Sequence, residues 1–478
     1  MTEIVGPTTV RSFGFNIPCR RFLIRANVTH DRRLPVVDEF VLRALKLCED
    51  VPVRRLATYF GFSVAETEKV MGDLMAAGLV IVDGDNARLH PSAHEHFRGS
   101  EDGAPQIVEV DSWVERLWFD LVSRNMAAPD RARMVRSHLI DIRPSDMARD
   151  LPASYAMKAF EQNFAEYLRR VRRMRNPNRF ALYSVSESIA ERFGSLVFRM
   201  EEELVFDSEP HLRPNLLTIE AEEMPRFTKL ATAMLDAYRG LNWMSSSATA
   251  LAEFSGLSGE STVTDAYGGS ARFDLGRWLS LNPDKMPPNR RNLVGASYIH
   301  RNVNSLVDLI DDLSKSPPSV DLAKEHEIVW YRPGGSGWGC SPELQEAIQS
   351  IKFALRRKFG KGPIRTKLIC PSVSRRDHPE RFKNLFDEGF FAPAGFLSPA
   401  VEIVHIPEVA TLMLVNVALS ASVEIPVGFA STAAQPLERA ARKLARVDVK
   451  FDEIWKGERR EEDELLPSPP EVDDNSDD

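Results

Sequence analysis

The segment from Pro35 to Leu89 constrains the fold more tightly than any other, because helix, turn and strand signals follow one another there without interruption. Ser63, with Glu66 three residues later, forms the capping-box pattern that begins a helix. Gly61 lies just before it, at a turn between two segments of helical periodicity. The predicted elements are helices from Pro35 to Cys48, Val53 to Phe60 and Ser63 to Gly78, and hairpin strands over 79–82 and 87–89.

This order of three helices and a two-stranded wing resembles the winged helix-turn-helix family over about residues 35–92. The residues that carry the resemblance are Leu56, Ala57, Phe60, Gly61, Phe62, Ser63, Met71, Leu74, Gly78, Leu79 and Val80. The resemblance implies that the third helix is a recognition helix, which in DNA-binding members lies in the major groove. A fold of this kind does not by itself establish DNA binding.

The surface expected for this third helix is acidic. Its exposed candidates include Glu66, Glu68, Lys69 and Asp73, and it has no Arg or Asn that would read a base edge. Because carboxylates repel phosphates, these four residues are predicted to bind a protein partner rather than bases. Arg54, Arg55 and Arg88 remain candidates for contact with a nucleic-acid backbone.

The net charge of −8 lies entirely in residues 457–478, which contain ten acids and two arginines, so residues 1–456 are neutral overall. This tail is predicted to be disordered because it has few apolar residues to bury. Three roles stay open for it: a solvated tail, a partner-binding tail, or a mimic of nucleic acid that competes for a basic surface.

Two basic segments are the candidates for binding nucleic acid, with DNA expected and its backbone as the target, since cationic side chains release counterions from phosphates. The first is a run of arginines: Arg169, Arg170, Arg172, Arg173 and Arg175. The second lies within residues 349–376, which contain no acid; its candidates are Lys352, Arg356, Arg357, Lys358, Lys361, Arg365, Arg375 and Arg376. The alternatives are a solvated helix face and an interface with an acidic protein.

The predicted fold class is α+β and α/β multidomain. The predicted segments are a winged helix with a leading strand (1–100), a helical connector (101–179), a diverged α/β lobe (180–330), a second α/β lobe (331–456) and the acidic tail (457–478). The connector prediction depends on two apolar stripes at helical spacing. The first is Trp113, Leu117, Trp118 and Leu121, and the second is Phe160, Phe164, Tyr167, Leu168 and Val171. In the first lobe, a strand is predicted over 180–185, helices over 187–203, 225–238 and 302–313, and a loop over 245–269.

Residues 328–456 show a helix from Pro342 to Phe359 among several short apolar strands. The predicted strands are 328–331, 364–370, 401–405, 411–416 and 423–428, and a helix over 437–444 precedes the closing segment Phe451–Trp455. This order resembles the second lobe of the phospholipase D-like superfamily. Active members use His-x-Lys, in which His attacks phosphorus and Lys stabilises the developing charge. No histidine here has Lys two positions later, and Leu414-Val415-Asn416 stands where the motif is expected.

The resemblance therefore implies a pseudoenzyme, with no catalytic residue, metal or cofactor predicted. The function expected is a non-catalytic accessory subunit that binds nucleic acid, a partner protein or both in a bacterial DNA-processing or anti-phage defence complex. One alternative is a ligand-sensing transcriptional regulator. The other is a nuclease or phosphodiesterase with a non-standard site, in which His405, His378 and Ser431 are the suspects.

Other sequence features favour a cytoplasmic protein with no membrane partner. No stretch of about 18 apolar residues occurs, and the N-terminus lacks a secretory signal. The four cysteines are scattered and form no C-x-x-C pair, which favours a reducing compartment and disfavours cysteine-rich zinc sites. His90, His94 and His96 are close in sequence, but no neighbouring cysteine completes a zinc site, and surface histidines are expected.

Overall fold

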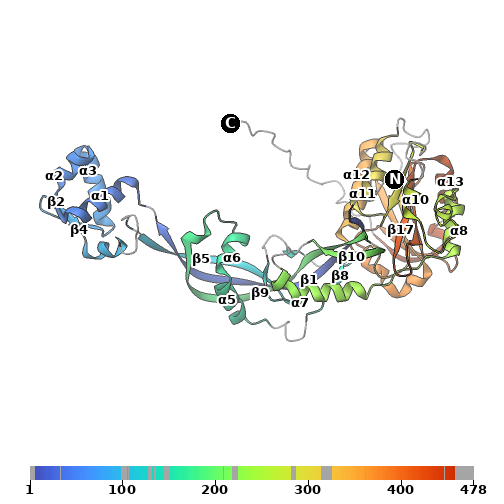
Figure 1. The fold of residues 1–478 in the computed structure, drawn as a ribbon, viewed down its shortest axis with the longest axis horizontal. Coiled ribbons are helices and arrows are strands. Elements are labelled where there is room, and N and C mark those ends of the chain that lie inside the picture. The colour runs from blue at the N-terminus through green and yellow to red at the C-terminus, as the bar shows by residue number, and fades with distance from the viewer. Residues whose placement is uncertain are drawn as a thin grey trace. The chain divides into compact units, whose positions relative to one another are not determined.

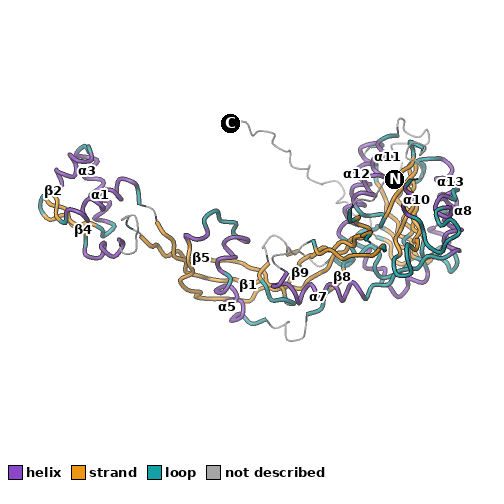
Figure 2. The backbone as a smooth tube through the Cα atoms, viewed as in Figure 1, coloured by secondary structure: helices purple, strands orange, loops and turns teal. Residues whose placement is uncertain are grey.

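The computed structural model of the chain is a mixed α+β structure with three β-sheets (Figures 1 and 2). It describes residues 6–32, 34–97, 105, 107–127, 132–133, 136–144, 151–207, 209–217, 224–280, 287–313, 326–360, 362–445 and 447–457. The chain divides into two compact units. Unit 1 comprises Met1–Pro18, Arg133–Pro144 and Ser195–Asp478, and unit 2 comprises Cys19–Ala132 and Ser145–Gly194.

The N-terminal elements of unit 2 confirm the predicted helices and hairpin. They are α1 (Val36–Cys48), α2 (Val53–Phe60), α3 (Val64–Ala76), β3 (Val80–Asp83), β4 (Asn86–Leu89) and the 3-10 helix η1 (Pro91–Phe97). The Ser63 hydroxyl accepts the Glu66 backbone N–H, and the Glu66 carboxylate accepts the Ser63 N–H, as the capping box requires. The sequence did not reveal β2 (Asp50–Pro52), which pairs with β4 in a sheet of order β2-β4-β3.

One face of each helix in this segment packs against the small sheet. The buried cluster includes Val41 and Leu45 from α1, Leu56 from α2, and Met71 and Leu74 from α3. Gly61 ends α2 in the left-handed region, at φ 72°, where a residue without Cβ avoids strain. The apolar spacing and the turn glycine therefore specify this arrangement from local signals.

The remainder of unit 2 is built on a pair of long antiparallel strands. These are β1 (Thr8–Arg32) and β5 (Ile107–Asp120), paired from Cys19↔Asp120 to Arg32↔Ile107, with β6 (Met126–Ala127) beside β5. The predicted helical stripe at Trp113, Leu117, Trp118 and Leu121 is wrong, because these residues lie in β5 or directly after it. Leu117, Phe119 and Leu121 belong to one buried cluster, as alternate residues on one face of a strand do, and Trp118 and Asp120 between them are also buried.

The predicted helix over 187–203 is also wrong. This segment belongs to β9 (Phe180–Phe206), which confirms the predicted strand at 180–185 and continues well beyond it. Leu196, Phe198, Met200 and Leu204 are buried at a period of two, while many positions between them are polar. In unit 1, the end of β9 pairs antiparallel with β10 (Pro210–Leu216).

Short helices cover the β1–β5 sheet of unit 2. They are α5 (Ala153–Gln162), α6 (Phe164–Glu166), the π-helical turn η3 (Tyr167–Val171) and the 3-10 turn η4 (Pro177–Arg179). Phe160, Phe164, Tyr167 and Leu168 pack on the inner face of the sheet. The predicted helical character of the connector is thus confirmed for its second part.

Unit 1 contains an eight-stranded sheet of order β11-β17-β16-β15-β12-β13-β14-β18. Its strands are β11 (Arg290–Val294), β12 (His326–Tyr331), β13 (Ile364–Cys370), β14 (Glu388–Phe391), β15 (Val401–Ile406), β16 (Ala410–Ala418), β17 (Glu424–Ser431) and β18 (Asp452–Lys456). β12, β13 and β14 are mutually parallel, and the other described pairings in this sheet are antiparallel. The predicted boundary between residues 330 and 331 lies inside β12.

Helices cover both faces of this sheet, and Figure 1 shows α11 and α12 on one side and α8 and α13 on the other. The helices of unit 1 are α7 (Met224–Arg239), α8 (Ala248–Ser258), α9 (Thr262–Asp265), α10 (Leu275–Leu279), α11 (His300–Asp311), α12 (Pro342–Phe359), α13 (Ala434–Lys443) and α14 (Val447–Lys450). Shorter pieces are the strands β7 (Ala132–Arg133, at the boundary between the units) and β8 (Ile140–Asp141) and the 3-10 helices η7 (Ser372–Asp377) and η8 (Pro379–Phe382).

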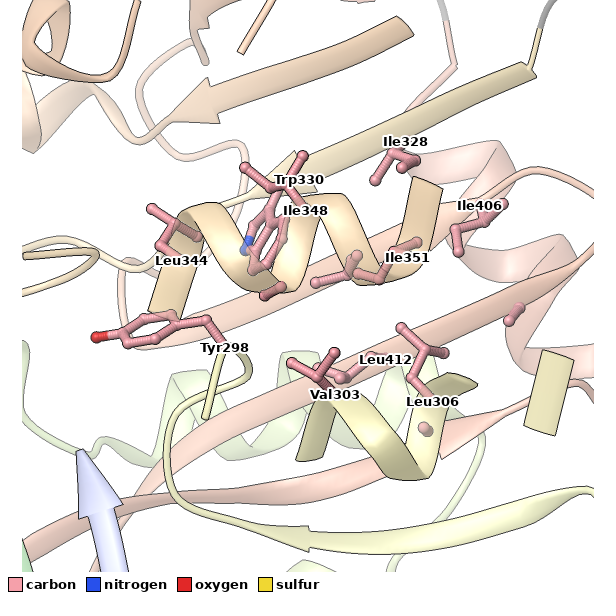
Figure 3. Close-up of a cluster of buried hydrophobic side chains, with 14 of the residues drawn as sticks. Tyr298, Val303, Leu306, Ile328, Trp330, Leu344, Ile348, Ile351, Ile406 and Leu412 are labelled. Carbon is pink, nitrogen blue, oxygen red and sulfur yellow. The ribbon is translucent and has the colours of Figure 1, made fainter. Parts of the chain in front are cut away.

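Each face of the sheet has its own buried core. Figure 3 shows the first, in which Val303 and Leu306 of α11 and Ile348 of α12 pack with Trp330 and Leu412 of the strands. The second lies under α8 and α13 and includes Phe254 and Ala440. The strand and helix predictions for residues 328–456 are confirmed within a few residues at each end.

The predicted loop over 245–269 is wrong because it contains α8 and α9. Ser247 caps α8 by accepting the Ala250 N–H, and Gly259 ends it at φ 77°. The serines and glycines that suggested a loop are therefore in part helix caps. Among the described residues, no helix has both the length and the apolar run needed to cross a membrane.

Candidate nucleic-acid interface and partner surface

The arginine cluster, defined as Arg169, Arg170, Arg172, Arg173 and Arg175, lies at the end of η3 and just beyond it. The helix ends where Arg173 adopts a left-handed conformation, φ 51°, and the Met174 N–H donates to the Leu168 carbonyl at 2.9 Å. This bond spans six residues, one more than in a Schellman motif, because the last turn of the helix is π-helical. Leu168 and Met174 pack in the core, so the five arginines stay on the surface, where all are exposed.

Two members of the arginine cluster are held by carboxylates. Arg172 is 2.8 Å from Glu115 and stacks over the Trp113 ring at 3.8 Å. Arg170 lies 3.6 Å from Glu166, one helical turn earlier. Ion pairs at an exposed surface contribute little free energy. The stacking of Arg172 on Trp113 is therefore expected to hold this side chain more strongly than its pair with Glu115 does.

The other three members, Arg169, Arg173 and Arg175, have no carboxylate partner within the described part of the chain. The Arg169 Nε donates to the Ala165 carbonyl at 3.3 Å, which does not neutralise its charge. Three unneutralised guanidinium groups within seven residues make a surface of positive potential. Such a surface can exchange counterions for phosphates with little loss of intramolecular contacts.

The second basic segment differs, because acids from other elements neutralise much of it. The carboxylate partners are Asp387 for Lys352 (3.9 Å), Asp311 for Arg357, Glu388 for Arg365 (3.5 Å) and Asp452 for Arg375 (2.5 Å). Lys358 donates to the Asp311 carbonyl at 2.9 Å, and Arg356 is half-buried. Arg376 is exposed, and Lys361 lies outside the described residues. The acid-free stretch of sequence therefore does not form a correspondingly free basic surface.

The predicted partner-binding residues lie on α3, but they are not equivalent. Glu68, Lys69 and Asp73 are exposed, whereas the Glu66 carboxylate is engaged by Ser63 in the capping box. The hydrogen bond from the Ser63 N–H lowers the pKa of Glu66, so this residue stays ionised to more acidic pH. The hairpin turn after β3 adds Asp83 and Asp85, and residues 34–97 contain ten acids against six bases.

An exposed apolar stripe that sequence reasoning missed lies on α1, and we call it the α1 stripe. Val36, Phe40 and Leu47 are 69 %, 49 % and 83 % exposed, and their spacing places them on one face of the helix. Arg43 stacks over Phe40 at 5.6 Å and pairs with Glu39 at 2.7 Å. The sequence alone could have indicated this stripe, because Val36, Phe40 and Leu47 follow helical spacing beside the apolar residues that pack in the core.

Leu414, Val415 and Asn416, at the position expected for the missing motif, lie in β16 and line a cavity of about 20 Å³. That volume holds about one water molecule. The cation at this cavity, Arg11, is neutralised by a buried ion pair with Glu202 and stacks on Trp243 at 4.3 Å. The cavity also contacts Trp338, which is buried against Phe382.

Glu402 is a second residue that sequence reasoning missed, although it stands out as an acid inside the apolar strand β15. Its Oε1 accepts hydrogen bonds from the Ser297 hydroxyl (2.5 Å) and from the indole N–H groups of Trp330 and Trp338 (2.9 Å each). Burial raises the pKa of Glu402, which favours the neutral acid. Its contacts indicate a structural role at the centre of the sheet.

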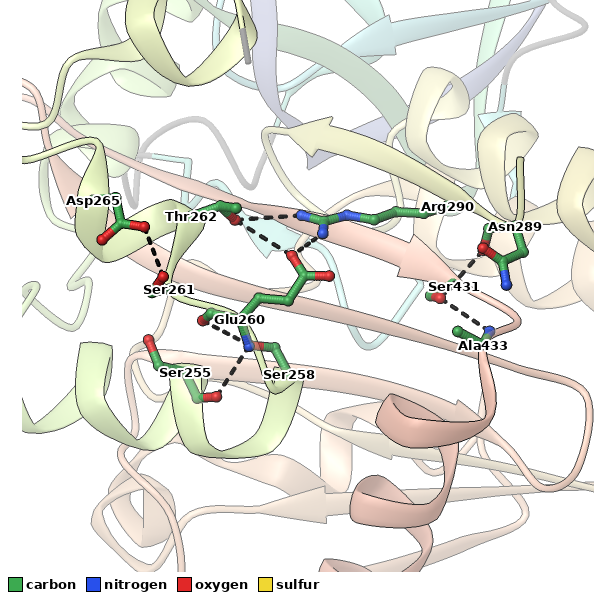
Figure 4. Close-up of polar contacts among 10 residues, drawn as sticks. All are labelled: Ser255, Ser258, Glu260, Ser261, Thr262, Asp265, Asn289, Arg290, Ser431 and Ala433. Carbon is green, nitrogen blue, oxygen red and sulfur yellow. Dashed lines mark hydrogen bonds and ion pairs between the residues drawn. The ribbon is translucent and has the colours of Figure 1, made fainter. Parts of the chain in front are cut away.

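The three residues suspected in the nuclease alternative are not brought together. His405 is opposite Thr411, which is opposite Ser431 on the next strand, so β16 separates the two. Figure 4 shows the Ser431 hydroxyl between the Asn289 carbonyl (3.2 Å) and the Ala433 N–H (3.1 Å), near the pair formed by Arg290 and Glu260. His378 is exposed in the turn between η7 and η8.

His405 itself is almost fully buried, and neither ring nitrogen has a hydrogen-bond partner among the described residues. Burial lowers the pKa of His405 to about 4. Near the wing, His90 Nδ1 lies 2.6 Å from the Ser92 hydroxyl. The part of the chain that the structure describes contains no group of three or more His, Cys, Asp or Glu side chains able to hold a metal ion.

No protein-family model, no curated protein and no solved structure matches this chain.

Proposed function

We propose that the protein is a non-catalytic binding subunit that contacts the phosphate backbone of nucleic acid, DNA being the expected ligand, through the arginine cluster. The observation that carries this proposal is the exposure of Arg169, Arg173 and Arg175 without a carboxylate partner within the described residues. Because the second basic segment is largely neutralised by acids, the arginine cluster supplies most of the affinity. Phosphate contacts of this kind bind without reading sequence.

The N-terminal segment fits a protein-docking role within the same proposal. Its α1-β2-α2-α3-β3-β4 order and its sheet β2-β4-β3 support the winged-helix resemblance. The exposed side chains of α3 and the wing are acidic and would repel phosphates, while the apolar stripe on α1 favours contact with a protein. The subunit would thereby connect nucleic acid to a partner in a DNA-processing or defence complex.

The experiment for nucleic-acid binding is fluorescence anisotropy with a labelled 30-mer duplex and the full-length protein. The triple variant Arg169→Ala, Arg173→Ala, Arg175→Ala is expected to weaken binding by at least about tenfold at low salt. The control removes three paired cations, Lys352→Ala, Arg365→Ala and Arg375→Ala, and is expected to bind almost as the wild type does. Equal losses in both variants would contradict the assignment to the arginine cluster.

A cleavage gel on the same samples separates this proposal from the nuclease alternative. We expect intact DNA in every lane, with and without added divalent cations. Cleavage that His405→Gln or His378→Gln abolishes would instead favour a non-standard catalytic site and overturn the non-catalytic proposal.

If the α1 stripe binds a partner protein, a variant of this stripe should lose the partner and keep its affinity for DNA. Phe40→Asp with Leu47→Asp places charge on the α1 stripe, where both side chains face solvent, so the fold is expected to survive. This variant should lose the partner that co-purifies with the wild type, while its affinity for DNA stays within about twofold. The matched control is Tyr59→Asp on α2, which is also exposed. Unchanged co-purification of the first variant would contradict docking through α1.

A further inference from the structure

A cavity of about 330 Å³ lies at the carboxyl ends of the parallel strands in unit 1, and we call it the strand-end cavity. Tyr331, the last residue of β12, lines it together with Pro371 directly after β13 and Pro393 two residues after β14. Parallel strands end at the same edge of a sheet, and in open α/β sheets this edge is where ligands bind. The volume is within the range of small-molecule sites.

The described walls of the strand-end cavity are mostly apolar and contain one acidic side chain. Prolines, Tyr331, Val373 and Leu397 provide apolar surface, and Thr249 and Ser372 contribute hydroxyl groups. Among the described residues that line the cavity, Glu253 of α8 is the one acidic or basic side chain. The Ser398 N–H donates to its Oε2 at 2.6 Å, which fixes the carboxylate, while Oε1 has no partner among the described residues.

Cations close to the cavity in sequence are directed elsewhere. Arg332, which follows Tyr331, is buried and donates to the Cys370 sulfur and to the carbonyls of Pro333 and Gly335. Arg375 pairs with Asp452 and stacks over Phe391 at 4.5 Å. No Lys or Arg is among the described residues that line the cavity, so a phosphate or carboxylate ligand would be repelled by Glu253 with no cation from these residues to offset the repulsion.

We propose that the strand-end cavity binds a small organic cation, with its amino, amidino or guanidino group on Glu253 and its apolar body against Tyr331 and the prolines. A carboxylate that lines a partly apolar cavity favours a charged donor over a neutral one, since charge-assisted hydrogen bonds are the stronger class. The hydroxyls of Thr249 and Ser372 provide further acceptors. This site uses no residue of the arginine cluster, so it is independent of nucleic-acid binding.

The test uses three probes of nearly the same shape and different charge: benzamidinium, benzamide and benzoate. Calorimetric titration of the full-length protein should show binding of benzamidinium, at least about tenfold weaker binding of benzamide, and none of benzoate. Glu253→Gln keeps an oxygen for the Ser398 N–H and should reduce benzamidinium affinity about tenfold or more. Glu438→Gln on α13 removes an exposed carboxylate and should leave the affinity unchanged.

Three results would overturn the proposal: no benzamidinium binding to a folded wild type, equal affinity in Glu253→Gln, or comparable binding of benzoate. A second variant guards against a folding defect in the first. Val373→Trp adds bulk to an exposed lining residue and should block all three probes while preserving the thermal transition. Undiminished benzamidinium binding by Val373→Trp would place the ligand elsewhere and would also overturn the proposal.

Discussion

At the scale of single residues, Glu402 shows how a buried acid is tolerated in unit 1. Three donors, from Ser297, Trp330 and Trp338, converge on its Oε1, and burial raises its pKa. A neutral acid satisfies these donors without the cost of a buried charge. Glu402 therefore has a structural role, because it fixes the positions of Trp330 and Trp338.

Glu402→Gln should change the free energy of unfolding of unit 1 by less than about 1 kcal/mol, because the amide keeps a neutral acceptor oxygen. Glu402→Leu should cost about 3 kcal/mol or more, because it leaves two indole N–H groups and a hydroxyl without an acceptor. Chemical denaturation followed by tryptophan fluorescence measures both. A large loss in Glu402→Gln would mean that the wild-type residue is ionised.

The burial of His405 makes the free energy of unfolding depend on pH. Its pKa is lowered by burial to about 4 in the folded state, so between pH 6.5 and 4 the unfolded chain binds the extra proton. The free energy of unfolding should therefore fall as pH falls through this window, by up to about 3 kcal/mol from this residue. His138, also lowered to about 4 by burial, acts in the same direction.

The check compares denaturation at pH 7 and pH 4.5 for the wild type, His405→Phe and the exposed control His378→Gln. His405→Phe should show a smaller loss between the two pH values than the wild type, whereas His378→Gln should follow the wild type. Equal losses in His405→Phe and the wild type would show that His405 does not carry the dependence.

At the scale of elements, the structure agreed with the sequence where capping residues mark the ends of helices. Ser63 with Glu66, and Pro342 preceded by Ser341, fix the starts of α3 and α12 through local hydrogen bonds. Predictions of helix failed where the structure has the long strands β5 and β9. Their exposed faces are rich in charge, and Arg21 and Arg116 both pair with Glu191 across strands. These ion pairs stabilise the strands. In the sequence, however, the same charged residues look like the solvent-exposed face of a helix.

Two glycines give opposite predictions within their elements. In β17, a Cβ at Gly428 would lie 2.0 Å from the Met413 carbonyl oxygen, so Gly428→Ala should destabilise unit 1 by about 3 kcal/mol or more. In α3, nothing lies within 4 Å of a Cβ at Gly72, so Gly72→Ala should stabilise that segment by about 1 kcal/mol. Thermal unfolding measures both changes, and a neutral Gly428→Ala would contradict the close strand approach.

Candidate sites were less predictable than elements because charge neutralisation is a tertiary property. The arginine cluster could be found from sequence, since its exposure follows from the local end of η3. The pairing of Arg365 with Glu388 and of Arg375 with Asp452 could not, because it depends on which strands adjoin in the sheet. The strand-end cavity likewise forms only when three separate strands end together.

At the scale of the whole molecule, different parts of the chain offer different kinds of contact. The arginine cluster in unit 2 offers charge, the α1 stripe offers apolar surface, and the strand-end cavity in unit 1 offers a carboxylate. Each part can be altered without removing a buried side chain. A variant of one part should therefore lose the binding of that part alone. A variant that loses all three kinds of binding would instead indicate a loss of folding.

If the arginine cluster binds nucleic-acid phosphates, the affinity for DNA should depend on salt through these arginines. Each phosphate contact with duplex DNA contributes about 0.9 to the slope of log K against log salt. Relative to the wild type, the variant lacking Arg169, Arg173 and Arg175 should have a slope smaller in magnitude by about 2 to 3. The variant lacking Lys352, Arg365 and Arg375 should keep the wild-type slope. An unchanged slope in the first variant, or an equal decrease in both, would show that the arginine cluster does not bind the phosphates.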